Sequence, residues 1–301
     1  MIRARVRCSV LISVLLLAAV ASAKPVEDEK TAVDQLSGMS AGQLKTLITS
    51  AQKGVSSAQA LLGVAYLKGI GVEKNERAAF EWFTRASKKK QTVAENNLGL
   101  MYFFGEGTPR NYPDAIRCFR AASDEGSAEA QFNLALMYHH GYGVQVDMNE
   151  AAKWYEIAAR QGLAKAQNVL ASLYETGSGV VKDRDQAMLW YTKAAESGYA
   201  VAQFNLASID LEAHDRTAAM HWFMLAAKQG HPEATRNLIS LYLHGDEAKL
   251  DYREAYRWLV AAHSTDAWTK ERMQLCRQHL SESDLNELDA NQAVASNTGK
   301  P

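Results

Sequence analysis

The residues with the clearest chemical potential are two adjacent histidines, His139 and His140, in the stretch LALMYHHGYGVQVD. Imidazole side chains can bind a metal, act as a base or respond to pH near neutrality. Neighbouring residues of a helix point about 100° apart, so these two rings cannot hold one metal ion as a pair spaced four residues apart can. The histidines therefore do not predict a paired metal site.

Two serines come next as candidates for chemistry. Ser50 and Ser87 stand three residues before Lys53 and Lys90, which is the S-x-x-K spacing of penicillin-recognising serine enzymes. The S-D-N and K-T-G partner motifs of those enzymes are absent, as are G-x-S-x-G, H-E-x-x-H and Walker sequences. We predict no catalytic residue, no metal ligand and no cofactor. A hydrolase or binding protein acting on β-lactams or peptidoglycan stays as an alternative.

The composition is that of a folded protein without an affinity for nucleic acid. The chain has 301 residues, of which 47% are hydrophobic and 22% charged, enough for a sizeable core. The formal net charge is −1, and no segment beyond the first seven residues accumulates Lys and Arg. Binding to DNA or RNA needs a surface that neutralises phosphates, so we exclude it.

The N-terminus has the order of a secretory signal peptide. Three arginines precede an apolar run from Cys8 to Val20, and Ala21-Ser22-Ala23 follows as a cleavage site. The run is shorter than the roughly 20 residues that span a bilayer, which makes a retained anchor the weaker alternative. We expect export, a periplasmic or secreted location, and no stable membrane span after cleavage.

The rest of the sequence repeats itself every 36 residues. Apolar or small residues recur at offsets 0, 4, 5 and 8 of each copy, as on one face of a helix. A G-x-G loop follows, in which glycine supplies the left-handed turn, and then a second helical stretch. The copies begin at Ala58, Ala94, Ala130, Ala166 and Ala202, and after this shortened fifth copy a sixth begins at Ala234. Each copy predicts a helical hairpin.

The pattern A-x-x-N-L-G/A-x-x-Y-x-x-G-x-G-V, followed by A-x-x-W-Y-x-x-A-A-x-x-G, resembles the Sel-like repeat (SLR) family, a branch of the tetratricopeptide-like α-solenoids. The resemblance covers about Ala58 to Ala267. It implies an all-α, right-handed α/α superhelical solenoid of helix-turn-helix repeats. The fifth copy departs from the pattern, because Asp210 replaces the tyrosine and DLEAHDRT replaces the G-x-G loop.

The sequence therefore predicts an exported precursor in which six repeats lie between an N-terminal and a C-terminal cap. The expected segments are a signal peptide (1–23), a flexible segment (24–39), an N-terminal capping half-repeat (40–57), six repeats (58–93, 94–129, 130–165, 166–201, 202–233 and 234–267), C-terminal capping helices (268–292) and a tail (293–301). Asp147, Asp183 and Asp251 are expected to cap second helices, and Ser281 or Ser283 to cap a terminal one. Cys118 belongs to the second repeat and Cys276 to the C-terminal capping helices, which are far apart in the stack, so we expect free thiols.

By the resemblance, the first helices line a concave face, and offsets 2, 6, 9 and 10 point into its groove. In the second and third copies these offsets are filled by Asn96, Leu100, Phe103, Phe104, Phe132, Leu136, His139 and His140. Exposed aromatic rings on a rigid face suit the anchoring of a partner. The alternative is that Phe103 and Phe104 pack against a neighbouring hairpin.

A stack of repeats leaves an extended surface free, which predicts a monomeric, non-catalytic protein that binds a partner protein. The resemblance implies that it is an adaptor or regulator of the bacterial envelope or the secreted fraction. A structural scaffold of an envelope complex is a further alternative. The slots of His139 and His140 hold unrelated residues in other copies, for example Glu175 and Thr176. The two histidines therefore stand at variable positions between the recurring tyrosine and glycines of the repeat. A pH-dependent contact of His140 with a partner is the hypothesis that remains for them.

Overall fold

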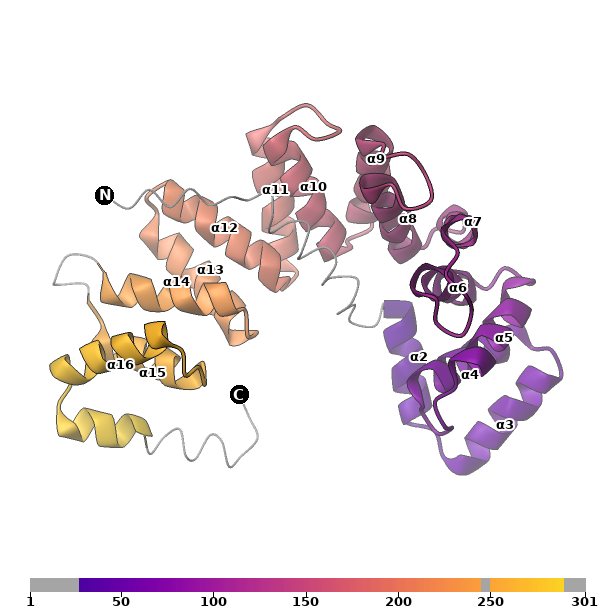
Figure 1. Ribbon diagram of the computed structural model, residues 1–301, viewed down its shortest axis with the longest axis horizontal. Helices are drawn as coiled ribbons and strands as arrows, with labels where there is room; N and C mark the ends of the chain where they lie inside the picture. The colour runs from indigo at the N-terminus through magenta and orange to yellow at the C-terminus, as the bar shows by residue number, and fades with distance from the viewer. Residues whose placement is uncertain (1–26, 245–249, 290–301) are drawn as a thin grey trace. The chain divides into compact units, whose positions relative to one another are not determined.

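The computed structural model describes residues 27–244 and 250–289, and the predicted all-α fold of helix-turn-helix repeats is confirmed there (Figure 1). The predicted signal peptide and C-terminal tail lie outside the described residues. The helices are α2 (Glu27–Ser37), α3 (Ala41–Gln52), α4 (Ser56–Lys68), α5 (Glu76–Ser87), α6 (Thr92–Phe104), α7 (Tyr112–Asp124), α8 (Ala128–His140), α9 (Met148–Arg160), α10 (Ala164–Thr176), α11 (Arg184–Glu196), α12 (Ala200–Glu212), α13 (Arg216–Lys228), α14 (Pro232–Leu243), α15 (Tyr252–Ala261) and α16 (Ala267–His279). A further helical stretch covers 282–289.

The described part of the chain forms two compact units, which divide between residues 158 and 159. In the first unit, α4 pairs with α5 and α6 with α7, and each hairpin packs on the next along the chain. In the second, α10 pairs with α11 and α12 with α13 in the same way, and α14 to α16 follow. Each unit therefore buries its core between hairpins that are neighbours in sequence, as repeat proteins do.

In each of the six repeats the second helix buries an aromatic ring at the same position of the repeat. These rings are Phe83, Phe119, Tyr155, Tyr191, Phe223 and Tyr256. In the first two repeats a glycine of the first helix lies opposite the ring, and the fit is tight, because a Cβ atom on Gly99 would lie 2.5 Å from Cε1 of Phe119. Trp154, which stands out in the sequence pattern, is only half-buried, and the ring at the centre is that of the next residue, Tyr155.

The two glycines of each G-x-G loop have different tasks. Gly105 ends α6 in the left-handed conformation (φ +80°) and donates its N–H to the Met101 carbonyl at 2.8 Å. Gly107 brings the loop against the preceding hairpin, since a Cβ atom there would lie 2.4 Å from the Glu76 carbonyl oxygen. In the fifth copy, which lacks these glycines, His214 takes the positive φ of +62° and turns the chain.

The predicted helix caps are confirmed. Asp147 accepts the Glu150 N–H at 3.0 Å, Asp183 accepts those of Asp185 and Gln186, and Asp251 accepts that of Glu254. Of the two serines considered at the C-terminus, Ser281 is the cap, because its Oγ accepts the Asp284 N–H at 3.1 Å. Residues 268–292 thus contain most of α16 and the 282–289 helix, and 290–292 lie outside the described chain.

A glutamine bond joins successive hairpins. The side-chain amide at offset 1 of the repeat donates to a main-chain carbonyl eight residues earlier, near the end of the preceding second helix. The donors are Gln59, Gln131, Gln167 and Gln203, at 3.1, 3.4, 3.1 and 3.1 Å. In the second copy Glu95 occupies this slot; it is buried, and its Oε2 has no hydrogen-bond partner.

The N-terminal segment requires a correction. The sequence predicts a flexible stretch over 24–39, but residues 27–37 form α2, which packs against α4. Ala32, Val33 and Leu36 provide the reason, because their spacing gathers three apolar side chains on one face, and Leu36 is buried in the core of the first unit. The stripe is short and lies among charged residues, so the composition of the segment conceals it.

Cys118 and Cys276 are free thiols, as the sequence predicts. Burial is the main cause that raises the pKa of each thiol to about 11. A thiol with so high a pKa holds little reactive thiolate at neutral pH. Both side chains pack in hydrophobic cores, so their role is structural.

Candidate partner-binding site

Six aromatic side chains of the second and third repeats form a connected surface group, which we call the aromatic cluster. Its members are Phe103, Phe104, Tyr112, His139, His140 and Tyr142. Gly105 and Gly141 end α6 and α8, which places the first members of the cluster in the last turns of these helices. Gly143 brings Tyr142 close to Tyr112, because a Cβ atom on Gly143 would lie 2.6 Å from the Tyr112 Cβ.

Phe103 lies at the centre of this cluster. Its ring centroid is 5.4 Å from that of Tyr112, 5.2 Å from that of Tyr142 and 5.0 Å from that of Phe104. Tyr142 belongs to the next repeat, so Phe103 packs against a neighbouring hairpin, as the alternative interpretation has it. Phe104 is 38% exposed and rests on the half-buried ring of Phe103. The cluster therefore offers one exposed ring on a fixed aromatic base.

The eight residues predicted to line the groove fall into two layers. Asn96, Phe132 and Leu136 are buried, with exposed fractions of 4, 2 and 5%. The Asn96 Oδ1 accepts a hydrogen bond of 2.9 Å from Asn133 Nδ2, which joins α6 to α8, and Phe132 packs on Tyr155. A partner could reach these side chains only by displacing the core. The accessible layer is Leu100, Phe103, Phe104, His139 and His140.

The two histidines stack on each other and carry no charge at neutral pH. Their ring centroids are 4.5 Å apart, and His139 Nδ1 lies 3.4 Å from the Tyr155 hydroxyl oxygen. Burial, followed by the neighbouring His140, lowers the pKa of His139 to about 4, and burial lowers the pKa of His140 as well. The described chain contains no group of three or more His, Cys, Asp or Glu that could hold a metal ion.

The bond between Tyr155 and His139 belongs to a pattern that sequence reasoning missed. In the fourth repeat the Tyr191 hydroxyl donates to Glu175 Oε2 at 2.9 Å, and Glu175 occupies the same repeat slot as His139. Where the buried ring is phenylalanine, as in Phe119, that slot holds an apolar residue, here Phe103. The pairing is visible in the aligned copies, but only once the buried position is known. His139 therefore serves the core as well as the surface.

The serine–lysine pairs show no catalytic arrangement. The Ser87 hydroxyl donates to the Thr84 carbonyl at 3.1 Å, and Lys90 pairs with Glu125 at 3.4 Å. Ser50 lies on α3 and lines a pocket of the first unit, but Lys53 is not among the residues that line it. Neither serine thus has a described contact with the lysine that would have to activate it as a base.

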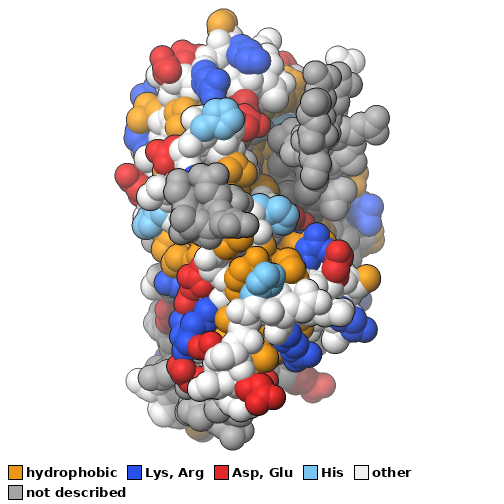
Figure 2. Space-filling model, turned by 90° about the vertical axis from the view of Figure 1, so that its left-hand side faces the viewer, with side chains coloured by type: hydrophobic (Ala, Val, Ile, Leu, Met, Phe, Trp, Pro, Cys, Tyr) orange, Lys and Arg blue, Asp and Glu red, His pale blue; other side chains and the backbone are white. Residues whose placement is uncertain are grey.

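The charged side chains form a mixed surface. Figure 2 shows Lys and Arg interspersed with Asp and Glu, with hydrophobic and histidine side chains between them. Such mixing gives no field of one sign on that face. Across residues 27–244 and 250–289, no helix is both long and apolar enough to cross a membrane.

Helical hairpins that pack in chain order, with glycine turns and buried aromatic rings, define a protein of the α-solenoid class. The Sel1 repeat family matches residues 56–90, 92–127, 128–163, 164–199, 200–231 and 232–262. These matches cover more than half of the chain, which therefore belongs to the Sel1 repeat family. The matched repeats begin two residues before the copies as counted from the sequence period.

Two solved structures are similar to the chain. One is c5321, a protective antigen present in uropathogenic Escherichia coli strains that displays an SLR fold, with 27% identity, a TM-score of 0.63, and coverage of 82% of this chain and 62% of the antigen. The chain thus spans less than two thirds of that protein. The other is a Sel1 repeat protein from Oxalobacter formigenes, with 32% identity, a TM-score of 0.62, and coverage of 71% and 87%. The comparison with curated proteins gives no match.

Proposed function

We propose that the chain is an exported, non-catalytic adaptor or regulator that binds a protein partner through the accessible layer of Leu100, Phe103, Phe104, His139 and His140. The observation that carries this function is the exposed ring of Phe104 on the fixed base of Phe103, Tyr112 and Tyr142. A ring held in place loses little conformational entropy when a partner covers it, which is typical of interface anchors.

The electrostatics favour a partner segment that is apolar where it meets the cluster. The lowered pKa values keep both histidines neutral at pH 7, so the cluster presents rings without charge. A charged group of the partner placed there would lose hydration and gain no counter-charge. The partner is therefore a protein that presents an apolar side chain to Phe104.

Export is part of the proposal and rests on the sequence of the first 23 residues. The similar Escherichia coli protein is a protective antigen, which supports a location outside the cytoplasm for this chain too. We propose the periplasm, with the secreted fraction as the alternative. Fractionation of cells that produce the full chain, with N-terminal sequencing of the mature form, tests the location and the cleavage after Ala23.

The binding site is tested by placing a photo-crosslinking amino acid at position 104 in cells and identifying the captured protein by mass spectrometry. Position 189 is a matched control, because Leu189 is an apolar residue of similar exposure, 44%, on α11. We expect one partner to crosslink at 104 and not at 189. In purified form, the Phe104→Arg variant should no longer bind that partner, while the Leu189→Arg variant should bind it as the original chain does. The helical circular dichroism of both variants should match that of the original chain.

Two results would overturn the proposal. The first is equal capture of the partner by the Phe104→Arg variant and the original chain. The second is turnover of nitrocefin or a muropeptide that disappears in Ser50→Ala, because that would make the chain a hydrolase. Phe132 is left out of the test, since an arginine in place of this buried ring would disturb the fold.

A further inference from the structure

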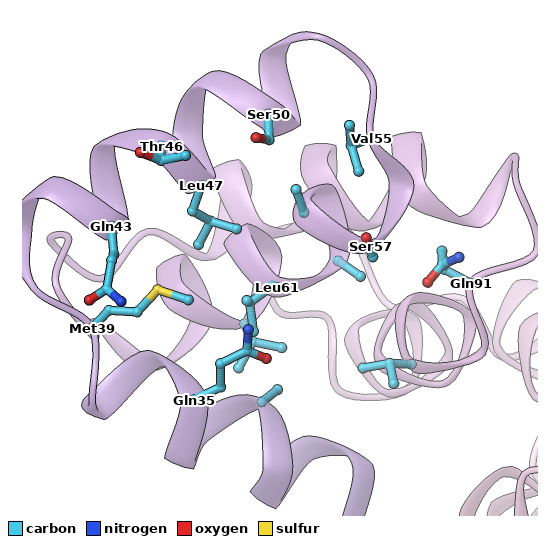
Figure 3. Close-up of a pocket in the computed structure, with 15 residues that line it drawn as sticks. Gln35, Met39, Gln43, Thr46, Leu47, Ser50, Val55, Ser57, Leu61 and Gln91 are labelled. Carbon is cyan, nitrogen blue, oxygen red and sulfur yellow. The ribbon is translucent and has the colours of Figure 1, made fainter.

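A pocket of about 490 Å³ opens between α2, α3, α4 and the start of α6 in the first unit (Figure 3). Pockets that bind small ligands or short segments generally have volumes of about 300 to 1,000 Å³. Ala60, Leu61 and Val64 of α4 form an apolar floor, and Met39 and Leu47 flank it. None of these residues belongs to the aromatic cluster, so the pocket is a separate site.

The pocket exists because the first repeat has a small residue where the other copies have large ones. Ala60 occupies offset 2 of its copy. In the following copies this slot is filled by Asn96, Phe132, Asn168, Phe204 and Arg236. In the third repeat the ring of Phe132 fills the space and packs on Tyr155. The missing volume at Ala60 is thus left open, and α2, which lies outside the repeats, closes it on one side.

The rim carries polar groups without charge. Six of its residues have amide or hydroxyl side chains, namely Gln35, Gln43, Thr46, Ser50, Ser57 and Gln91, and the lining residues whose side chains the structure describes include no Asp, Glu, Lys, Arg or His. Figure 3 shows Gln43, Thr46 and Ser50 along one helix and Gln91 at the far end. A glutamine amide offers one carbonyl acceptor and two N–H donors, which match the carbonyl and N–H groups of a peptide main chain.

The hydrogen bonds that the rim side chains already make favour a ligand that both donates and accepts hydrogen bonds. Gln43 Oε1 already accepts the Ser40 N–H at 2.8 Å, so its amide nitrogen is the group that can donate outward. Thr46 donates to the Gly42 carbonyl at 3.0 Å, which leaves its oxygen as an acceptor. A charged ligand would lose hydration in the pocket and find no counter-charge among the described residues that line it. An uncharged extended peptide satisfies both conditions.

We propose that this pocket binds the main chain of an extended, uncharged peptide segment and seats one of its apolar side chains over Ala60. The polar rim bonds the main-chain groups on either side of that residue, and the floor of Leu61 and Val64 covers its side chain. This site and the aromatic cluster can each bind without the other.

The probe for this site is the capped peptide Ac-Gly-Ala-Val-Ala-Gly-NH2, added to the full chain with ¹³C-labelled methyl groups. We expect saturable NMR shifts of the methyl signals of Met39, Leu61 and Val64. Peptides with Lys or Glu in place of the central Val should bind about tenfold more weakly or not at all, since their charge is not compensated. Equal binding of the charged peptides, or no saturable shift, would overturn the proposal.

The matched variant is Ala60→Phe, which introduces the residue that the third and fifth copies have in this slot. It should abolish the shifts at Met39 and Val64, while Gln52→Phe, on the exposed surface of α3 outside the pocket, should leave binding intact. If Ala60→Phe lowers the melting temperature, Ser57→Trp at the exposed rim replaces it and should block binding equally. Undiminished binding in the folded variant would refute the site.

The two proposals fail separately. Phe104→Arg should bind the probe peptide as the original chain does, and Ala60→Phe should still crosslink its partner from position 104. Loss of probe binding in Phe104→Arg would contradict the separation of the sites.

Discussion

The second and third repeats have the same backbone frame and differ in the side chains that fill it. In the second, Gly99 faces the ring of Phe119, and Phe103 lies in the last turn of the first helix; all three are apolar. In the third, Tyr155 is the buried ring, and its hydroxyl reaches His139 at the equivalent of Phe103. A buried phenylalanine thus occurs with an apolar residue at the end of the first helix, and a buried tyrosine occurs with a residue that can form a hydrogen bond to its hydroxyl.

The fourth repeat follows the same relation, since Tyr191 donates to Glu175. The sixth shows its limit: Leu243 occupies the slot, and the Tyr256 hydroxyl instead donates to Asp289 and accepts from Arg277 at the C-terminal end. A buried hydroxyl needs a hydrogen-bond partner wherever it can find one, because leaving it unsatisfied costs stability. The residue at this position of the repeat must therefore first suit the buried ring, and only within that limit can it vary to suit a binding partner.

The largest effect that separates the two repeats is expected from Gly99→Ala. The new Cβ atom would lie 2.5 Å from the buried Phe119 ring, so the hairpin must open, at a cost of about 2 to 3 kcal/mol. The reverse change in the third repeat, Ala135→Gly, should cost only about 1 kcal/mol, the helix propensity of glycine. Urea denaturation followed by circular dichroism measures both. A smaller loss for Gly99→Ala than for Ala135→Gly would contradict the packing described for Phe119.

An exchange of the buried hydroxyl is expected to have the next largest effect. Phe119→Tyr buries a hydroxyl beside the apolar Phe103 and should lower stability by about 1 to 2 kcal/mol. The additional change Phe103→His should restore much of this loss, since it supplies the partner that Tyr155 has in His139. A double-mutant cycle of the thermal melts gives the coupling. If the losses of stability from the two substitutions simply add, positions 119 and 103 are not coupled in free energy and the proposed pairing is wrong.

The smallest effect concerns the glutamine joint. Glu95→Gln should raise stability at pH 7 by about 1 kcal/mol, because a buried oxygen without a partner is replaced by an amide that can donate to the preceding hairpin. Burial, with Glu125 as the second cause, raises the pKa of Glu95 above its ordinary 4.5. The folded state then binds more protons than the unfolded state above that pH, so Glu95 destabilises increasingly as pH rises through its raised pKa.

The gain in melting temperature from Glu95→Gln should therefore be larger at pH 7 than at pH 4.5. Gln131→Glu, the reverse change in the third repeat, serves as the control and should lower stability at pH 7. A gain that is independent of pH would show that the charge of Glu95 is not the cause.

The hairpins could be predicted from the sequence because six copies can be aligned, and an offset that recurs reveals a common environment. The caps at Asp147 and Asp183 are equally local, since a side chain and the next turn suffice to define them. Helix α2 has no copy with which to compare it, and its apolar face rests on Leu36 and two small neighbours. The period therefore carried no information there.

Exposure at the candidate site could not be predicted for a different reason. The period gives the direction of a side chain from its own helix axis, but it does not give the neighbour that covers it. Phe132 and Phe104 are both assigned to the groove by their offsets, yet the first is 2% and the second 38% exposed. The difference arises from Tyr155, which packs on Phe132 from the second helix of the same repeat.

The glutamine joint between hairpins also has a consequence for how such a chain can evolve. The donor and its carbonyl acceptor lie eight residues apart, as in Gln59 and Ala51, so each joint is encoded by one short continuous stretch of the gene. A duplicated DNA segment of one repeat length carries its joint with it and needs no compensating change elsewhere. Unequal recombination can therefore lengthen or shorten the array one hairpin at a time.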